Sequence, residues 1–142
     1  MTAPVVLHTP TFDESSEGLT YMWENASDSI LGTAAKPGAK LSGCDIATAN
    51  TDFPIGVVVS VAKQYEGVKV VEEGIVPAIA GGALAVGDYV VATTAGHFIT
   101  ATLTANPFAT MYYVWGRAET ATTTDGNVFM LRLIPFNALQ KT

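Results

Sequence analysis

The stretch Asp88–Ile99, DYVVATTAGHFI, contains a strand, a tight turn and the start of a second strand. Valine, isoleucine and aromatic residues fill its two arms, and these residue types are enriched in strands. Gly96 lies in the central Thr94–His97 segment, where a hairpin needs a residue that adopts positive φ. The stretch therefore predicts a β-hairpin.

The same pattern continues along the chain in both directions. Thirteen glycines and seven prolines separate short apolar runs, and within the runs the apolar residues recur with a period close to two. Further strands are predicted at Leu19–Trp23, Ile55–Val61, Val68–Val71, Ile75–Ile79, Tyr112–Ala118 and Val128–Ile134. Many short strands favour a mostly β fold, a small barrel or sandwich, over any α/β fold.

Two local signals complete the secondary-structure prediction. Thr124–Asn127 carries the Asp-Gly pair favoured in type I′ turns and predicts a second hairpin. Asn106–Thr110 begins with Asn-Pro, and because Asn can cap a helix and Pro suits the first helical position, it predicts one short helix.

The chain divides into an arm and one domain. Its 142 residues fit a single domain that can bury a core without disulfides or metal. Residues 1–17 hold Val5, Val6, Leu7 and Phe12 among prolines and polar residues, too few apolar side chains for a core. We expect an extended N-terminal arm over residues 1–17 and a single β domain over residues 18–142. Within that domain, residues 32–54 are rich in Gly, Ala, Pro and Thr and are predicted as loop that holds at most one strand.

Charged residues are scarce. They make up 14% of the chain, against about 25% in a typical soluble domain, while apolar residues make up 49%. This composition excludes a solvated disordered chain and indicates that a partner covers part of the surface. The net charge is −6, and Arg117 and Arg132 are the two arginines. Because the sequence has no basic patch to neutralise phosphates, we expect no nucleic-acid partner.

The sequence also gives expectations about compartment. Cys44 is the single cysteine, so the sequence contains neither a disulfide framework nor a cysteine-based zinc cluster. Met1–Val5 lacks the basic start and long apolar run of a signal peptide, and no stretch reaches the roughly 18 apolar residues of a membrane helix. We expect a protein that is made in a cytoplasm and has no membrane partner.

The residues that could carry catalysis have structural interpretations. His8 and His97 are the two histidines, and neither stands at metal-ligand spacing. Glu72 and Glu73 are adjacent, and neighbouring strand residues point to opposite faces, so the pair is interpreted as a solvated strand end. The Gly-Asp-x-Val pattern at Gly87–Val90 occurs in some serine/lysine peptidases but fits a tight turn in any barrel. We predict no enzyme activity and no catalytic, cofactor-binding or metal residues.

The aromatic run around Tyr113 and Trp115 has two interpretations. Residues two apart in a strand share a face, so these two side chains are expected side by side. They would form an interface with another subunit, where Tyr and Trp are enriched. As an alternative function, they would form a stacking platform for sugars in a carbohydrate-binding or adhesion module.

The order of several segments resembles one known family. The segments are Pro54–Val58, Tyr65–Val70, Glu73–Ala78, Ala80–Val90, Gly96–Ile99, Val114–Ala118 and Val128–Leu133. In this order, across roughly residues 54–135, the chain is similar to tailed-phage capsid decoration proteins, also called capsid cement or head-stabilising proteins. The arm is longer and more acidic than is typical of that family, and residues 18–53 match nothing in it.

The resemblance implies a fold and a function. Members of the family are small β-barrel or β-tulip domains that bind the outside of an expanded icosahedral head, commonly as trimers and sometimes as dimers, and hold neighbouring capsid subunits together. It implies the major capsid protein as partner, a homotrimer or dimer, and a place on the outer capsid surface of the virion. The interface candidates are Val5, Val6, Leu7, Phe12, Tyr113 and Trp115.

The arm supplies a first test of this interpretation. An extended Val5–Leu7 segment can pair with an exposed strand edge of a capsid subunit and place its apolar side chains in pockets. Deletion of residues 1–17 is therefore expected to leave a folded oligomer that no longer decorates heads, as measured by co-sedimentation. Full binding by the truncated protein would show that the arm has no part in attachment.

Overall fold

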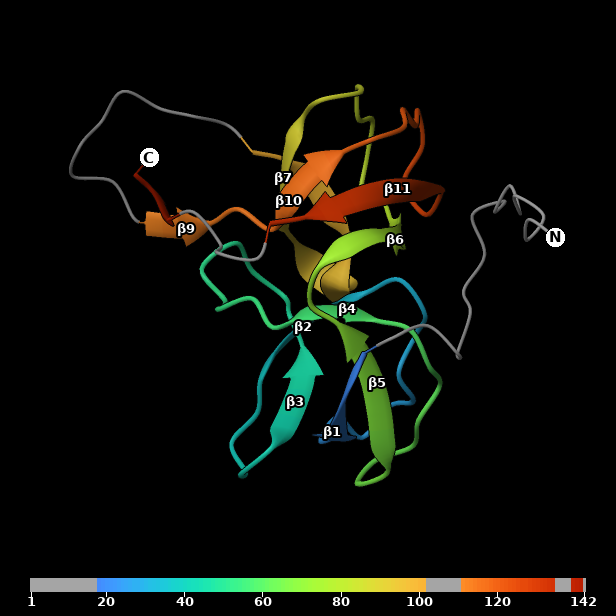
Figure 1. Ribbon diagram of the computed structural model, residues 1–142, viewed down its shortest axis with the longest axis vertical. Helices are drawn as coiled ribbons and strands as arrows, with labels where there is room; N and C mark the ends of the chain where they lie inside the picture. The colour runs from blue at the N-terminus through green and yellow to red at the C-terminus, as the bar shows by residue number, and fades with distance from the viewer. Residues whose placement is uncertain (1–17, 102–110, 135–138, 142) are drawn as a thin grey trace, which may run out of the picture.

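The computed structural model describes residues 18–101, 111–134 and 139–141 (Figure 1). These residues form strands and connecting loops, and the helical segment among them is the single 3₁₀ turn η1 (Thr94–Gly96). The prediction of a mostly β fold with a small barrel is confirmed. The predicted arm over residues 1–17 and the predicted helix at Asn106–Thr110 lie outside the described residues.

The N-terminal half forms a closed five-stranded barrel. Its strands are β1 (Leu19–Trp23), β2 (Ala34–Pro37), β3 (Gly43–Ile46), β4 (Gly56–Val58) and β5 (Gly67–Val71), in the order β1-β3-β2-β4-β5. The barrel closes because β5 pairs with β1, and every pairing is antiparallel except that of β1 with β3. Closure leaves no unpaired edge strand in this sheet.

The prediction for residues 32–54 was wrong, because this segment contributes both β2 and β3. The strands are built from small residues, and Ala34, Ala35, Gly43 and Cys44 are all buried. Ala35 and Cys44 belong to the cluster inside the barrel, which also holds Trp23, whereas Ala34 belongs to the core that is shared with the second sheet. Small side chains at these positions leave room for the large buried residues of the same clusters, so β2 and β3 lack the large residues typical of strands. The strand propensity of the residues therefore gave no signal for β2 and β3.

The second sheet contains strands from the C-terminal half. They are β6 (Gly74–Ile79), β11 (Val128–Leu133), β10 (Gly116–Ala118), β7 (Tyr89–Ala92) and β8 (Phe98–Thr100), in the order β6-β11-β10-β7-β8. All neighbours are antiparallel. A parallel bridge between Ala80 and Phe98 joins the end of β6 to β8. In Figure 1 this sheet lies above the barrel, and the two-stranded ribbon of β9 (Met111–Tyr113) and β12 (Leu139–Lys141) lies to one side.

The predicted strand Tyr112–Ala118 is divided between two sheets, since β9 ends at Tyr113 and β10 begins at Gly116. The residues between them, Val114 and Trp115, are both buried, which breaks the alternation of a regular strand. Val114 packs with Val91, whereas Trp115 enters the main core. The predicted strand Ile55–Val61 is also shorter, as β4 covers only Gly56–Val58.

Both predicted hairpins are present, although one turn has a different type. β7 and β8 pair across Thr94–His97, and Gly96 has φ +71. β10 and β11 pair across a loop that includes Thr124–Asn127. There φ is positive at Gly126 but not at Asp125, and the Asn127 amide donates to the Thr124 carbonyl, as in a type II turn. Type I′ was wrong because the connection is long, so its turn need not match the twist of the two strands.

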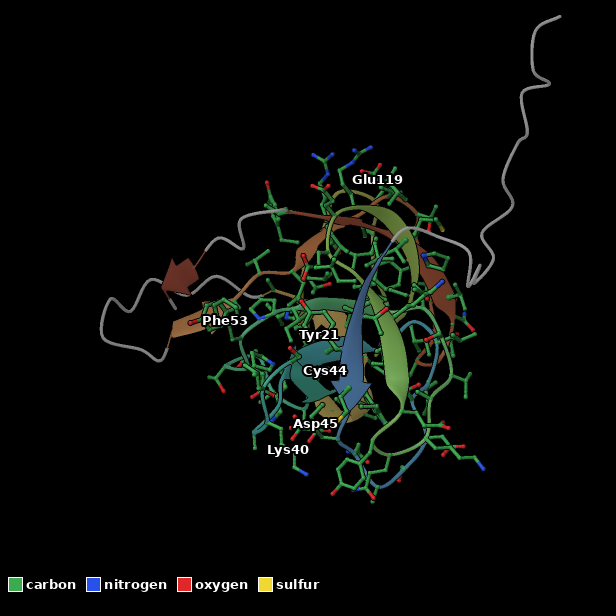
Figure 2. The ribbon with its side chains drawn as sticks, turned by 60° about the horizontal axis from the view of Figure 1, so that its bottom comes forward. Tyr21, Lys40, Cys44, Asp45, Phe53 and Glu119 are labelled. Atoms are coloured by element: carbon green, nitrogen blue, oxygen red, sulfur yellow. The ribbon has the colours of Figure 1, made fainter. Side chains whose placement is uncertain are left out.

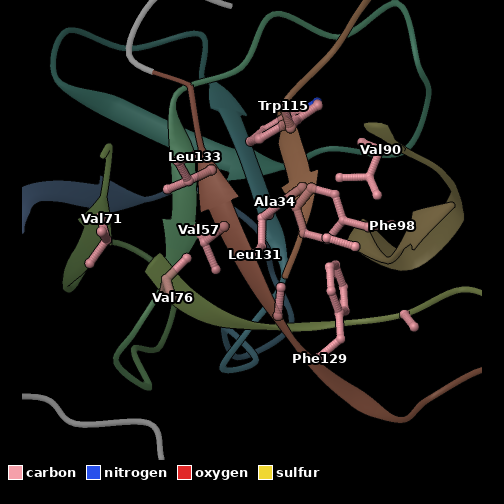
Figure 3. Packing of buried hydrophobic residues seen from close by; sticks show 14 of the residues in the cluster. Ala34, Val57, Val71, Val76, Val90, Phe98, Trp115, Phe129, Leu131 and Leu133 are labelled. Atoms are coloured by element: carbon pink, nitrogen blue, oxygen red, sulfur yellow. The ribbon is translucent and has the colours of Figure 1, made fainter. Parts of the chain in front are cut away.

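One apolar core joins the barrel to the second sheet. Its largest side chains are Trp115, Phe98, Phe129 and Leu131, and the barrel contributes Ala34, Val57 and Val59 (Figure 3). The Phe98 ring meets Trp115 and Phe129 edge to face, at centroid distances of 5.5 and 6.2 Å. A smaller cluster around Trp23, Cys44, Val58, Val68 and Val70 fills the barrel interior.

Replacement of Phe98 tests this core. Phe98→Ala removes a fully buried ring that contacts two other aromatic rings, and such truncations cost about 3–5 kcal/mol of unfolding free energy. Urea denaturation measures the loss. As a control, Val86→Ala removes an exposed side chain and is expected to change the free energy by less than about 0.5 kcal/mol. Similar losses for the two variants would contradict the assignment of Phe98 to the core.

Candidate binding surfaces

Among the side chains singled out for possible catalysis, His97 and Asp88 have structural roles, and His8 lies outside the described residues. His97 Nδ1 lies 3.0 Å from Asp125 Oδ1, so this histidine links the two hairpin turns. Asp88 Oδ2 accepts hydrogen bonds from the Ala85 amide and the Thr100 hydroxyl, and Gly87 has φ +90, as expected for a tight turn. Among the described residues, no group of three His, Cys, Asp or Glu side chains is placed to hold a metal ion.

The predicted solvated strand end at Glu72 and Glu73 is confirmed, since both residues are exposed between β5 and β6. The Tyr21 hydroxyl donates to Glu72 Oε1 at 2.5 Å. Partial burial of Tyr21 and this bond raise the pKa of Tyr21 to about 12.

In the part of the chain that the structure covers, no helix has the length and apolar character needed to cross a membrane.

Trp115 is not an interface residue. Its side chain is 0% exposed and packs against Phe98 in the core, so the predicted face shared with Tyr113 was wrong. The break between β9 and β10 removes the alternation on which that prediction depended. Tyr113 is half-buried and instead meets the exposed Phe53 edge to face, at 5.4 Å. The other interface candidates, Val5, Val6, Leu7 and Phe12, lie outside the described residues.

An exposed apolar surface lies at one end of the barrel, where the β2–β3 turn meets the β4–β5 loop. We define this barrel-end surface as Lys40, Leu41 and Tyr65. Leu41 is 96% exposed and Tyr65 is 56% exposed. The Lys40 ammonium lies 4.4 Å from the centre of the Tyr65 ring, a cation–π contact that joins the two loops. Figure 2 labels Lys40 at the lower left of the molecule.

Glu24 holds the β2–β3 turn in place. Its carboxylate accepts hydrogen bonds from the backbone amides of Ala39 and Lys40, at 3.0 and 3.2 Å. The carboxylate lies so close to the turn that a Cβ at Gly38 or Gly43 would fall 1.6 or 1.7 Å from Glu24 Oε2. Glycine at these two positions therefore allows the carboxylate to approach, and its hydrogen bonds hold the turn that carries Leu41.

Two residues of the barrel end have left-handed backbone conformations. Ser42 has φ +57 and Tyr65 has φ +67, conformations that are unfavourable for residues other than glycine. Main-chain bonds hold both, because the Ser42 carbonyl accepts from Met22 and the Tyr65 amide donates to Trp23. Backbone strain of this kind concentrates at functional sites. The two loops are thus held by main-chain hydrogen bonds while they expose a leucine and a tyrosine side chain.

A second surface lies on the outer face of the other sheet. Arg117 on β10 and Arg132 on β11 are direct cross-strand partners. Both side chains contact Glu119 Oε1, at 3.3 Å from Arg117 and 2.5 Å from Arg132. The hydrogen bond from Arg132, followed by that from Arg117, lowers the pKa of Glu119. Figure 2 shows Glu119 at the upper edge of the molecule. We call Arg117, Glu119 and Arg132 the arginine face.

Neither surface was identified from the sequence. Leu41 and Lys40 lie in the segment predicted as loop, and Phe53 lies at its end. The sequence showed that the chain has only two arginines, but the pairing of β10 with β11 was needed to place them side by side. A signal was available in the strand alternation, because Arg132 interrupts an otherwise apolar run.

Comparisons with known proteins give a structural match without a sequence match. No protein-family model matches the chain, and no curated protein matches it. The fold is similar to the crystal structure of the head fiber gp8.5 N base in bacteriophage phi29, with a TM-score of 0.61. The match covers 86% of this chain and 97% of that one, at 18% sequence identity. At this identity the likeness establishes the fold.

Cys44 allows a test of the barrel interior. Burial, and then the neighbouring Asp45 and Glu24 carboxylates, raise the pKa of the Cys44 thiol to about 12. The thiolate is the reactive form, so we expect negligible reaction with a disulfide reagent at pH 8 and complete reaction after denaturation. The absorbance of the thiol that the reagent releases measures the reaction of the native and of the denatured protein. Because the folded pKa is raised, this group destabilises the folded state only as the pH rises above the ordinary thiol value near 9. Rapid reaction of the native protein would contradict a closed barrel.

Proposed function

We propose that this chain is a structural virion protein that binds the outer surface of an icosahedral phage head and stabilises the capsid lattice. Its partner is the major capsid protein, and its own copies assemble as a homotrimer or a dimer. It performs no catalysis, is made in the host cytoplasm and resides on the outer capsid surface.

The observation that carries this proposal is the fold similarity to the head fiber base, which spans nearly all of both chains. Independently, the order of segments across residues 54–135 resembles the capsid decoration family. One likeness comes from three-dimensional structure and the other from sequence, and both concern proteins of the phage head. The low share of charged residues, 14%, also fits a protein that is partly covered by a partner.

The barrel-end surface supplies a contact of the required kind. Leu41 and Tyr65 are exposed apolar side chains on loops that Glu24 and Trp23 hold in place. Because the loops are already ordered, binding through them loses little conformational entropy. A symmetric oligomer would present several copies of this surface at once, which raises avidity without new contacts. A protein that binds only the assembled lattice stabilises that lattice by mass action.

The alternative function, a carbohydrate-binding or adhesion module, loses its structural basis. It required Tyr113 and Trp115 on one exposed face, and Trp115 is buried. The structure therefore favours a single proposed function.

The proposal is tested by co-sedimentation of the protein with empty expanded heads. Leu41→Ser removes an exposed apolar side chain at the barrel end. Burial of a leucine side chain contributes about 1.5–3 kcal/mol, so the affinity for heads is expected to fall about tenfold to a hundredfold.

The matched control is Val86→Ser, which changes an exposed side chain in the loop before β7 on the other sheet. It is expected to bind like the unchanged protein. Light scattering after size exclusion gives the oligomeric state in the same series. An unchanged protein that is monomeric and does not sediment with heads would refute the proposed function, and equal binding by both variants would refute the role of the barrel end.

A further inference from the structure

The arginine face carries more positive charge than its own residues neutralise. Arg117 and Arg132 are directly opposed on neighbouring strands, an arrangement that is unfavourable for like charges. The single carboxylate of Glu119 meets both of them through one oxygen atom. Each guanidinium has five N–H donors, and about half of each side chain is exposed. The face therefore suits a ligand that brings further carboxylates.

Apolar side chains lie at both ends of this pair. Ile75 on β6 is the cross-strand partner of Arg132, and Tyr89 on β7 is the partner of Arg117. All four side chains are exposed and form one row across four strands of the sheet. A row of apolar, cationic, cationic and apolar side chains matches an extended peptide that carries carboxylates next to an apolar residue.

The chain itself contains such a peptide. Asp13, Glu14 and Glu17 follow Phe12, and residues 1–17 contain no lysine or arginine. These three carboxylates give the segment a charge of −3, which is half of the net charge of −6. The acidic excess of the chain is thus concentrated in a few consecutive residues, and both of its arginines lie on one face.

The described structure begins at Gly18, beside the strand that leads into β6 of the second sheet. Gly18 lies against the backbone of Val70 on β5, and β5 leads through Glu72 and Glu73 into β6. From Val71 to Ile75 the chain spans at most about 14 Å, and Arg132 is about 5 Å from Ile75 across the strand pair. This path is at most about 19 Å, and residues 13–18 can extend about 17 Å. The side chains of Asp13 and Glu14 and of the arginines can cover the remaining distance.

The register of β1 with β5 favours an arrangement in which the chain before Leu19 turns away from this strand pair. Leu19 is opposite Val70, so a continued pairing would place Glu17 opposite Glu72. Like charges directly opposite each other destabilise a strand pair. The carboxylates of the segment would gain opposite charges instead if the chain turned away from β5 and crossed toward β6 and β11.

We propose that residues 13–17 of the chain dock on its own arginine face, with their carboxylates paired to Arg117 and Arg132. This contact fixes the root of the N-terminal segment on the second sheet and leaves residues 1–11 to extend from there. The proposal does not depend on the proposed function, because both binding partners belong to one chain.

A spin-label experiment on the full chain tests the docking. Ser15→Cys accepts a nitroxide, while the buried Cys44 does not. In isotope-labelled protein, the amide signals of Arg117 and Arg132 are expected to broaden and that of Leu41 to stay sharp. Broadening is expected to be lost in 0.5 M salt, because the pairing is exposed.

Three variants make the result specific. Arg117→Gln with Arg132→Gln should abolish the broadening. The triple variant Asp13→Asn, Glu14→Gln, Glu17→Gln should also abolish the broadening. It leaves the sheet unchanged, so the test remains valid if the arginine variant folds poorly. Lys63→Gln, which removes a positive charge on the β4–β5 loop of the barrel, should have no effect.

Two outcomes would overturn the proposal. The first is an absence of broadening in the labelled protein, or broadening that persists both in the double arginine variant and in the triple acidic variant. The second is broadening that arises between molecules, in a mixture where the nitroxide and the isotope are on different copies. That result would assign the acidic segment to the face of a neighbouring subunit.

Discussion

The edge-to-face packing of Phe98 against Trp115 and Phe129 is the interaction on which the rest of the structure depends. These rings lie between the barrel and the second sheet, and Ala34 and Val57 of the barrel pack into the same cluster. A shared core of this kind fixes the two sheets as one unit. The barrel-end surface and the arginine face are therefore held on one rigid support.

The distribution of charge gives each surface a separate character. The chain has few charged residues, and several of them are used to hold backbone or to pair with each other: Glu24 holds a turn, Asp88 holds another, and Glu119 bridges the two arginines. The barrel end exposes Leu41 and the Tyr65 ring beside the Lys40 ammonium, whereas the other sheet presents paired guanidinium groups. An apolar surface favours protein contacts of large buried area, and a charged one favours a specific acidic segment.

The sequence predicted the parts of the fold that depend on local pattern. Alternation located β1, β5, β6, β7 and β11, and Gly96 and Gly126 located the hairpins. It failed for β2 and β3, whose buried residues are small, and for Trp115, which is buried where two sheets meet. The two candidate surfaces depend on contacts between segments distant in sequence, such as Lys40 with Tyr65 and Arg117 with Arg132. Such contacts leave no local pattern.

Electron cryomicroscopy of empty expanded heads mixed with the purified protein tests the central claim most directly. The account predicts added density on the outer surface at local threefold or twofold positions, into which the barrel and the second sheet fit as one rigid body, with the barrel end against the capsid. Heads without added density, together with a protein that remains monomeric in solution, would contradict it.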